Sequence, residues 1–135
     1  MKRRHFATGT QWEPVVGYSR AVRVGPFVRV SGTTATDEAG EVMGVGDPRA
    51  QMVRTLENVR QALEGVGASL ADVIRTRMYV TDINAWEEIG RVHGEVFAEI
   101  RPATSMVEVT RLIHPDMLVE VEAEALVMTE GEDVQ

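Results

Sequence analysis

Residues 101–128 read RPATSMVEVTRLIHPDMLVEVEAEALVM, and their patterning predicts two β-strands, at 104–110 and 117–128. Along the second strand small apolar residues alternate with glutamates, so one face is apolar and the other is acidic. The apolar face carries Val119, Val121, Ala123, Ala125 and Val127, and the acidic face carries Glu120, Glu122 and Glu124. Such a strand covers a core on one side and presents carboxylates on the other.

Three further strands are predicted upstream. Residues 20–24 and 27–31 are expected to form a hairpin around Gly25-Pro26, a turn-forming pair. Residues 73–81 alternate between apolar and polar side chains, which is typical of a half-buried strand. Residues 36–47, rich in glycine and aspartate, are expected to form a loop.

Two helices are predicted between these strands. Over residues 48–66 apolar side chains recur in steps of four and three, which places them on one side of a helix. A second helix is expected near residues 85–100, because Asn84-x-x-Glu87 resembles a capping box and Arg101-Pro102 disfavours further helical geometry. The element order β-β-α-β-α-β-β therefore predicts an α+β domain, a single-layer mixed β-sheet with two helices packed on one face.

The other face of this predicted sheet is polar. It would carry Arg29, Arg75, Arg77, Tyr79, Glu120 and Glu122 among smaller residues. A face of this kind can be hydrated, or it can form a subunit interface in which arginines pair with glutamates. The periodicity of the sequence leaves both alternatives open.

Composition indicates an ordinary globular chain. Of its 135 residues 44% are hydrophobic and 26% are charged, which fits one domain, residues 1–135, with a frayed tail at 130–135. No apolar run approaches the roughly 20 residues that a membrane helix needs. No apolar stretch follows the basic residues 1–6, so no signal peptide is predicted and a cytoplasmic location is expected. The absence of cysteine excludes disulfides and thiolate catalysis.

Charge and histidine spacing argue against two kinds of binding. The net charge of −7, from 21 acidic and 14 basic residues, opposes binding of a nucleic-acid backbone. His5, His93 and His114 are scattered without the spacing of metal ligands, so no metal site is expected.

Several short motifs resemble those of the Rid (reactive intermediate deaminase, YjgF-type) family. Residues 101–109 and 118–123 are similar to its C-terminal signature, a Pro-Ala-Arg-Ser strand followed by an Ile-Glu-Ile-Glu-Ala strand. Shorter matches lie upstream in the family's order: Gly17-Tyr18, Val30-Ser31-Gly32, Leu56-Glu57-Asn58-Val59 and Tyr79-Val80-Thr81-Asp82. The resemblance covers residues 14–128, nearly the whole chain.

This resemblance implies a fold like that of chorismate mutase and a homotrimer whose sheets form a barrel-like core. It also implies a small-molecule cleft at each subunit interface. In the deaminating members an arginine binds the carboxylate of a 2-imino or 2-enamino acid. Water activated near a glutamate then adds to the C=N carbon, and ammonia leaves. The resemblance implies no cofactor and no metal.

Carried over residue by residue, the resemblance places Tyr18 at the family's cleft tyrosine, Ser31 at its cleft serine and Glu120 at the glutamate that positions water. These three are the candidate catalytic residues. Each also has a structural interpretation: Tyr18 as an interface residue, Ser31 as a strand-end hydroxyl, and Glu120 as one of several ion-paired glutamates. A carboxylate in a shielded cleft has a raised pKa that suits proton transfer.

The family's carboxylate-binding arginine is replaced by Thr104, and a neighbouring cysteine by Met106. A guanidinium binds a carboxylate through two parallel hydrogen bonds, whereas threonine offers one uncharged hydroxyl. Loss of a charge-assisted contact of about 1.5–3 kcal/mol weakens imino-acid binding at least tens of times, unless another cation substitutes. Arg101 is the candidate substitute. Thr104, Met106 and Arg101 are therefore the predicted substrate-binding residues.

Two functions remain open. The first is hydrolysis of a small imine or enamine in a cleft of the Rid type, with an uncharged or differently anchored substrate. The second is a non-catalytic trimer that binds or senses a small metabolite. Ribonuclease activity, which is associated with some relatives, is a weaker third alternative because the chain is acidic.

Overall fold

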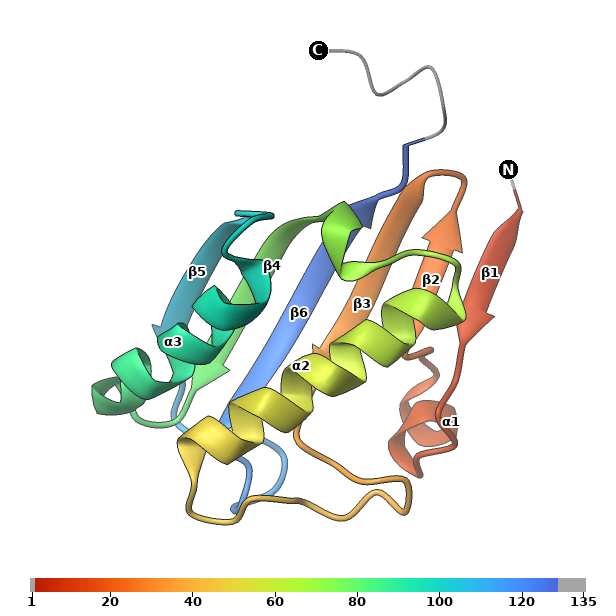
Figure 1. Ribbon diagram of the computed structural model, residues 1–135. Helices are drawn as coiled ribbons and strands as arrows, with labels where there is room; N and C mark the ends of the chain where they lie inside the picture. The colour runs from red at the N-terminus through yellow and green to blue at the C-terminus, as the bar shows by residue number, and fades with distance from the viewer. Residues whose placement is uncertain (1, 129–135) are drawn as a thin grey trace.

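The computed structural model describes residues 2–128, which form a six-stranded β-sheet in the order β1-β2-β3-β6-β4-β5 (Figure 1). All neighbouring strands are antiparallel except β4 and β5, which are parallel. The strands are β1 (Arg3–Phe6), β2 (Ala21–Val24), β3 (Phe27–Thr33), β4 (Val73–Val80), β5 (Ala103–Glu108) and β6 (Val119–Leu126). The tail predicted at 130–135 lies outside the described residues.

Two helices, α2 (Pro48–Gly65) and α3 (Trp86–Phe97), cover one face of the sheet (Figure 1). The Asp47 side chain accepts a hydrogen bond from the backbone N–H of Ala50 and so caps α2, whose first position is Pro48. α2 packs against β3 and β6, and α3 lies beside it over β4 and β5. The predicted α+β fold with a mixed sheet is confirmed. Within residues 2–128, no helix has the length and apolar character needed to cross a membrane.

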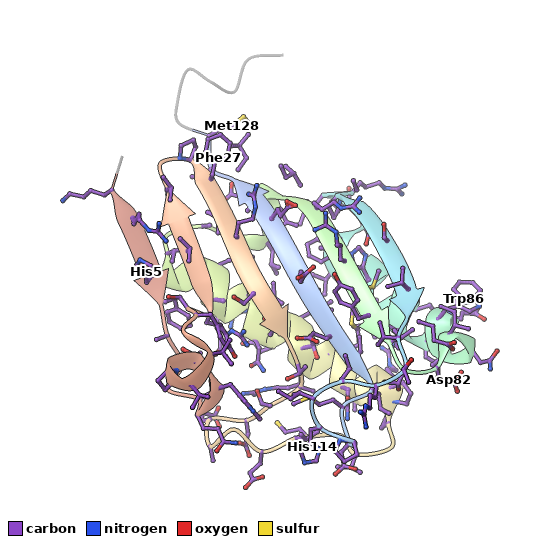
Figure 2. All side chains as sticks on the ribbon, turned by 180° about the vertical axis from the view of Figure 1, so that it is seen from behind. His5, Phe27, Asp82, Trp86, His114 and Met128 are labelled. Carbon is purple, nitrogen blue, oxygen red and sulfur yellow. The ribbon has the colours of Figure 1, made fainter. Side chains whose placement is uncertain are left out.

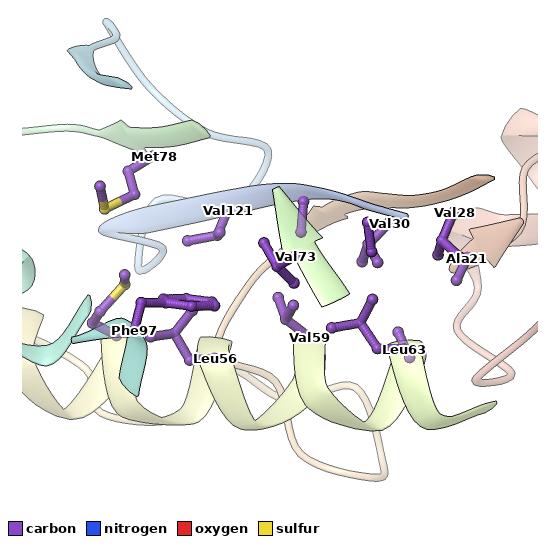
Figure 3. Packing of buried hydrophobic residues seen from close by; sticks show 14 of the residues in the cluster. Ala21, Val28, Val30, Leu56, Val59, Leu63, Val73, Met78, Phe97 and Val121 are labelled. Atoms are coloured by element: carbon purple, nitrogen blue, oxygen red, sulfur yellow. The ribbon is translucent and has the colours of Figure 1, made fainter. Parts of the chain in front are cut away.

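The core lies between α2 and the sheet (Figure 3). Leu56, Val59 and Leu63 point from the helix toward Val30 and Val121 of the strands. The alternation predicted for β6 is confirmed, because its apolar positions from Val119 to Ala125 are all buried. Removing this apolar surface from water, at about 25 cal/mol per Å², is the main force that holds the helix on the sheet.

The opposite face of the sheet is polar, and Figure 2 shows its strands in front of the helices. The hydroxyl of Tyr79 donates a hydrogen bond to Glu122 over 2.7 Å. Arg29 and Arg77 each have a guanidinium nitrogen 3.6 Å from the Glu124 carboxylate. Partly exposed ion pairs of this kind each stabilise a fold by about 0–1 kcal/mol, so they contribute little to the stability of the sheet.

Neither β1 nor the short helix α1 (Trp12–Val16) is predicted by the sequence patterning. β1 pairs with β2 at the edge of the sheet, and its residues Arg3–His5 are exposed. Charged side chains are common on edge strands, where they give no apolar alternation. α1 is little more than one turn and ends at Gly17, whose φ of 85° favours glycine. Both segments are therefore too short or too polar to show a period.

The capping box predicted for the second helix is wrong. The side chain of Asp82, not Asn84, provides the cap, and it accepts a hydrogen bond from the backbone N–H of Asn84 over 2.9 Å. This bond opens a 3₁₀ turn, η2 (Ile83–Ala85), which leads into α3 at Trp86. The helix ends at Phe97, three residues before the predicted boundary.

Candidate functional site

A β-bulge between β3 and β6 brings Gly32 against Glu120. The pairing register shifts between Val30 and Thr33, so that Ser31 and Gly32 together oppose one residue of β6. A Cβ at position 32 would overlap the Glu120 carboxylate and would lie 2.9 Å from its carboxyl carbon. The missing side chain of Gly32 therefore provides the space that the Glu120 carboxylate occupies.

The electrostatic surroundings of Glu120 favour its neutral form. Burial raises the pKa of its carboxyl, the positive charge of Arg20 opposes this rise, and the nearby Glu122 adds to it. A carboxyl that keeps its proton closer to neutral pH can donate that proton and take it back. Glu120 thus has the property expected of a general acid and base.

Ser31 lies in the same bulge as Gly32, and Tyr18 lies near the guanidinium of Arg20. The backbone N–H of Ser31 donates to the carbonyl of Arg20, and its hydroxyl donates to the carbonyl of Ser19 over 2.7 Å. The Ser31 hydroxyl thus satisfies backbone at a strand end, while its oxygen can still accept a hydrogen bond. The half-buried Tyr18 follows α1, and its backbone N–H donates to the carbonyl of Glu13.

Arg20 lies among these residues and was not among the predicted site residues. Its guanidinium carbon is 5.2 Å from the centroid of the Tyr18 ring, within the range of a cation–π contact. Its Nε is buried and has no hydrogen-bond partner among the described residues. We call Tyr18, Arg20, Ser31, Gly32 and Glu120 the Glu120 cluster.

The position of Arg20 could have been inferred from the predicted hairpin. A turn at Gly25-Pro26 pairs Ala21 with Val30, as is observed, and the next pair outward is Arg20 with Ser31. Since Ser31 was already a candidate, its partner across the hairpin belongs to the same site.

A cavity of about 590 Å³ adjoins this cluster. Its walls come from residues 8–12, residues 36–41 and the middle of α2, and Arg20 and Thr33 also line it. Hydroxyl groups are frequent in the lining, as at Thr8 and Thr10. The sequence patterning gave no indication of this cavity, because its walls are loops and a helix that only the fold brings together.

Thr104 lies in a second, different group of residues. The hydroxyl of Thr76 donates to the hydroxyl of Thr104 over 2.6 Å and lies 2.8 Å from Nε2 of His93. Burial lowers the pKa of His93, so this imidazole is neutral at pH 7. We call Thr76, His93 and Thr104 the Thr104 cluster, and it contains hydrogen bonds but no charge.

The two clusters lie on opposite faces of the sheet. Thr76 and His93 are buried on the side that the helices cover, so Thr104, bonded to Thr76, points to that side. Glu120 alternates with the buried positions of β6 and points to the polar face. Strand β4 also separates β6 from β5. A single chain therefore does not bring Thr104 and Glu120 together.

The other two predicted substrate-binding residues lie near Thr104. Met106 is half-buried and packs against the core, on the same face of β5 as Thr104. Arg101 is exposed just beyond α3, and its Nε donates back to the carbonyl of Ala98 over 3.0 Å. No group of three potential metal ligands occurs within residues 2–128.

Comparison with known proteins gives the family. The family model described as Endoribonuclease L-PSP matches residues 8–127 of the chain. The chain belongs to this family, the Rid or YjgF-type family. The resemblance seen in the sequence is confirmed, and the match begins a few residues earlier than the motifs indicated.

Several Rid relatives are similar over most of their length. A RutC family protein of Pyrococcus abyssi is 41% identical over 112 residues, which cover 82% of this chain and 87% of that protein. The 3-aminoacrylate deaminase RutC of Acinetobacter baylyi is 36% identical over 108 residues, which cover 80% and 85%. The structure of Rv2704 from Mycobacterium tuberculosis, of the YjgF/YER057c/UK114 family, is 52% identical with a TM-score of 0.86, covering 93% of this chain and 100% of that chain.

Proposed function

We propose that this Rid family member is a cytoplasmic hydrolase that releases ammonia from a small enamine or imine. The observation that carries the proposal is the Glu120 carboxyl, whose pKa is raised by burial beside Gly32. Ser31 lies in the same bulge as Gly32, and Tyr18 lies near Arg20, whose charge acts on Glu120. The family resemblance implies a place in a reactive cleft for both Ser31 and Tyr18. A relative named for the deamination of 3-aminoacrylate supports the reaction class.

The reaction needs one group that both gives and takes a proton. Protonated Glu120 donates its proton to the enamine carbon, or to the imine nitrogen, and leaves an electrophilic C=N carbon. The Glu120 carboxylate then takes a proton from water as the water oxygen bonds to that carbon. Glu120, protonated again by this step, gives its proton to the carbinolamine nitrogen and takes the hydroxyl proton as the C–N bond breaks and the C=O bond forms. The products are ammonia and a carbonyl compound. Ser31 and Tyr18 supply hydrogen bonds that orient the substrate and the water.

The cleft is proposed to form between copies of the chain in a homotrimer. The opposite orientation of Thr104 and Glu120 supports this, because the two can share one ligand only if they come from different subunits. The polar sheet face, with its arginines and glutamates, would then be the barrel-like interface. Sedimentation of the purified protein as a single subunit would contradict this assembly.

Thr104 sets a limit on the substrate. Without a guanidinium on β5, a 2-imino acid has no bidentate partner at that position. The protein is therefore proposed not to be an ordinary 2-imino acid deaminase. Its substrate is either uncharged or anchored by a group elsewhere in the cleft.

The test is ammonia release from imines generated in situ, some with a carboxylate and some without. The wild-type protein should accelerate release above the buffer rate, and Glu120→Gln should reduce kcat about 10²–10⁴-fold, the usual contribution of an acid–base group. Glu122→Gln is the matched control, because Glu122 lies on the same face of β6 and already binds Tyr79. Equal losses in both variants, or no acceleration for either class of imine, would reject the hydrolase.

A non-catalytic ligand-binding trimer is the second candidate. The uncharged Thr104 cluster favours it, since such a group can bind a ligand without promoting chemistry. A trimer of this kind would be stabilised thermally by a small metabolite that it does not convert. Ribonuclease activity, named in the family description, has no support from a net charge of −7.

A further inference from the structure

The guanidinium of Arg20 is the one feature of the Glu120 cluster that the proposed chemistry does not use. We infer that Arg20 binds the carboxylate of a small organic acid, and that the anchoring charge therefore lies beside Glu120 instead of on β5. This inference rests on the proposed function for the reaction, but it concerns a binding residue that the proposal leaves open. With Arg20 as the carboxylate-binding residue, carboxylated enamines and imines are substrates even though Thr104 replaces the arginine on β5.

Arg20 has hydrogen-bond donors to offer. Its Nε is buried and unpartnered among the described residues, and no ion pair within 4.0 Å involves it there. A buried donor without a partner destabilises the folded protein, and a ligand that accepts a hydrogen bond from it removes that cost. The Tyr18 ring, 5.2 Å from the guanidinium carbon, supports one side of the group.

The nearest carboxylates of the protein are occupied. Glu13 is buried, and its oxygens accept hydrogen bonds from the backbone and hydroxyl of Thr8 and from the hydroxyl of Thr10. Burial raises the pKa of Glu13, but these hydrogen bonds and the charge of Arg20 more than offset the rise. Burial also raises the pKa of Glu120, and the charge of Arg20 opposes that rise. Arg20 thus acts on both carboxylates through its charge, but within residues 2–128 it forms no ion pair within 4.0 Å with either.

Two acidic residues of the adjoining cavity, Asp37 and Glu38, also have partners. Asp37 accepts hydrogen bonds from the backbone N–H groups of Ala39 and Glu41 in its own loop. Glu38 is 89% exposed and lies 3.5 Å from the guanidinium of Arg54. A ligand carboxylate at Arg20 would therefore not compete with an existing ion pair.

The cavity has the size and chemistry for such a ligand. Its volume of about 590 Å³ exceeds that of a small organic acid, and Arg20 lies in its lining. The same guanidinium is close enough to Glu120 to act on its pKa. Glu120 is not among the residues that line the cavity, so a ligand with its carboxylate on Arg20 would extend beyond the cavity to bring its reacting carbon toward Glu120.

The first experiment compares turnover of a carboxylated imine with that of an uncharged imine of the same size. Arg20→Gln should lower the ratio of the two kcat/KM values by about tenfold to a hundredfold, through KM of the carboxylated imine. Arg91→Gln, which removes the same charge from an exposed arginine of α3, should leave the ratio unchanged. A ratio unaffected by Arg20→Gln, or lowered equally by Arg91→Gln, overturns the inference.

The second experiment needs no turnover. Propanoate should raise the Tm of the wild-type protein and of Glu120→Gln, propanamide should raise it less, and Arg20→Gln should lose the preference for propanoate. Propanoate stabilisation that depends on Arg20, without any ammonia release, would support the carboxylate site and reject the hydrolase. Turnover of uncharged imines only, with no propanoate effect, would support the hydrolase and reject the carboxylate site. Absence of any propanoate stabilisation also rejects the site.

Discussion

The Glu120 cluster and the Thr104 cluster differ in charge and in whether their polar groups have hydrogen-bond partners. In the Glu120 cluster a buried carboxyl lies beside an arginine whose Nε has no partner among the described residues. In the Thr104 cluster a neutral histidine, a buried threonine and an exposed threonine form one chain of hydrogen bonds. Charge and unmet hydrogen-bonding capacity thus lie on Arg20, just before β2, and on Glu120 of β6, whereas the Thr104 cluster of β4, β5 and α3 carries no charge.

This difference assigns the two clusters different tasks. Unmet capacity next to a shielded carboxyl suits binding and proton transfer. In the neutral chain, the hydroxyl of Thr76 donates to Thr104 and lies 2.8 Å from Nε2 of His93. The hydrogen of the Thr104 hydroxyl is then free to point away from the protein. Thr104 can donate one hydrogen bond to a ligand, but it cannot select a charge.

The largest expected difference between the two clusters comes from a substitution at Gly32, which should lower kcat. In Gly32→Ala the new Cβ would overlap the flexible Glu120 carboxylate, which has to move, while the backbone can stay in place. We expect kcat to fall about 100-fold, since a misplacement near 1 Å can cost that much, with little change in Tm. Gly90→Ala in α3 is the control, because no atom lies within 4 Å of its Cβ. If Gly32→Ala turns over normally, the position of Glu120 does not matter for the reaction.

Adding charge to the neutral cluster tests its task directly. Thr104→Arg should raise kcat/KM for a carboxylated imine at least about tenfold, because a guanidinium adds a bidentate contact of about 1.5–3 kcal/mol. Thr104→Lys, which adds charge without the planar fork, should gain less. Steady-state kinetics on both variants would check this, and no gain in either would mean that Thr104 does not face the substrate.

The fold was largely predictable because its main elements are periodic. The alternation of Val119 to Ala125 and the apolar stripe over residues 48–66 identify the central strand and the long helix, and both are observed. Elements without a period were not predictable, as for β1 and α1. The start of α3 was misassigned because Asp82 and Asn84 are both good capping residues, and only the 3₁₀ turn between them distinguishes the two.

The site was predictable where motifs are local and not where it depends on pairing. Ser31 and Glu120 come from strand motifs, and the bulge at Gly32 brings them together. Arg20 belongs to no motif, and its relevance follows only from its place opposite Ser31. Arg101 was chosen for its closeness to Thr104 in sequence, yet its side chain donates back to Ala98. Distance along the chain is thus a poorer guide to a substituting cation than the register of the hairpin.

The hydrogen-bond chain itself can be tested by stability. Thr76→Val keeps the side-chain shape but leaves buried His93 without its partner, which should lower the free energy of unfolding by about 1–3 kcal/mol. Thr55→Val is the control, because the buried hydroxyl of Thr55 has no partner among the described residues and its removal should cost nothing. Urea denaturation of both variants gives the comparison. Similar losses would mean that the His93 contact contributes no net stability.

The smallest expected effect is a pH-dependent gain in stability when the carboxyl of Glu120 is replaced. Because burial raises the pKa of Glu120 in the folded protein, the unfolded chain ionises first as the pH rises above the ordinary value of 4.5. The folded state therefore loses stability as the pH rises through the raised pKa, and a neutral Gln at this position avoids that loss.

Thermal unfolding of Glu120→Gln and the wild-type protein from pH 4 to pH 8 would measure this loss. The two Tm values should be nearly equal at the acidic end, and the variant should unfold a few degrees higher, roughly, at the alkaline end. Glu122→Gln should show no such gain, since Glu122 accepts a hydrogen bond from Tyr79. A difference in Tm that does not change with pH would mean that packing, and not the shielded charge, distinguishes Glu120. Glu120 would then be no better suited to proton transfer than the other glutamates of β6.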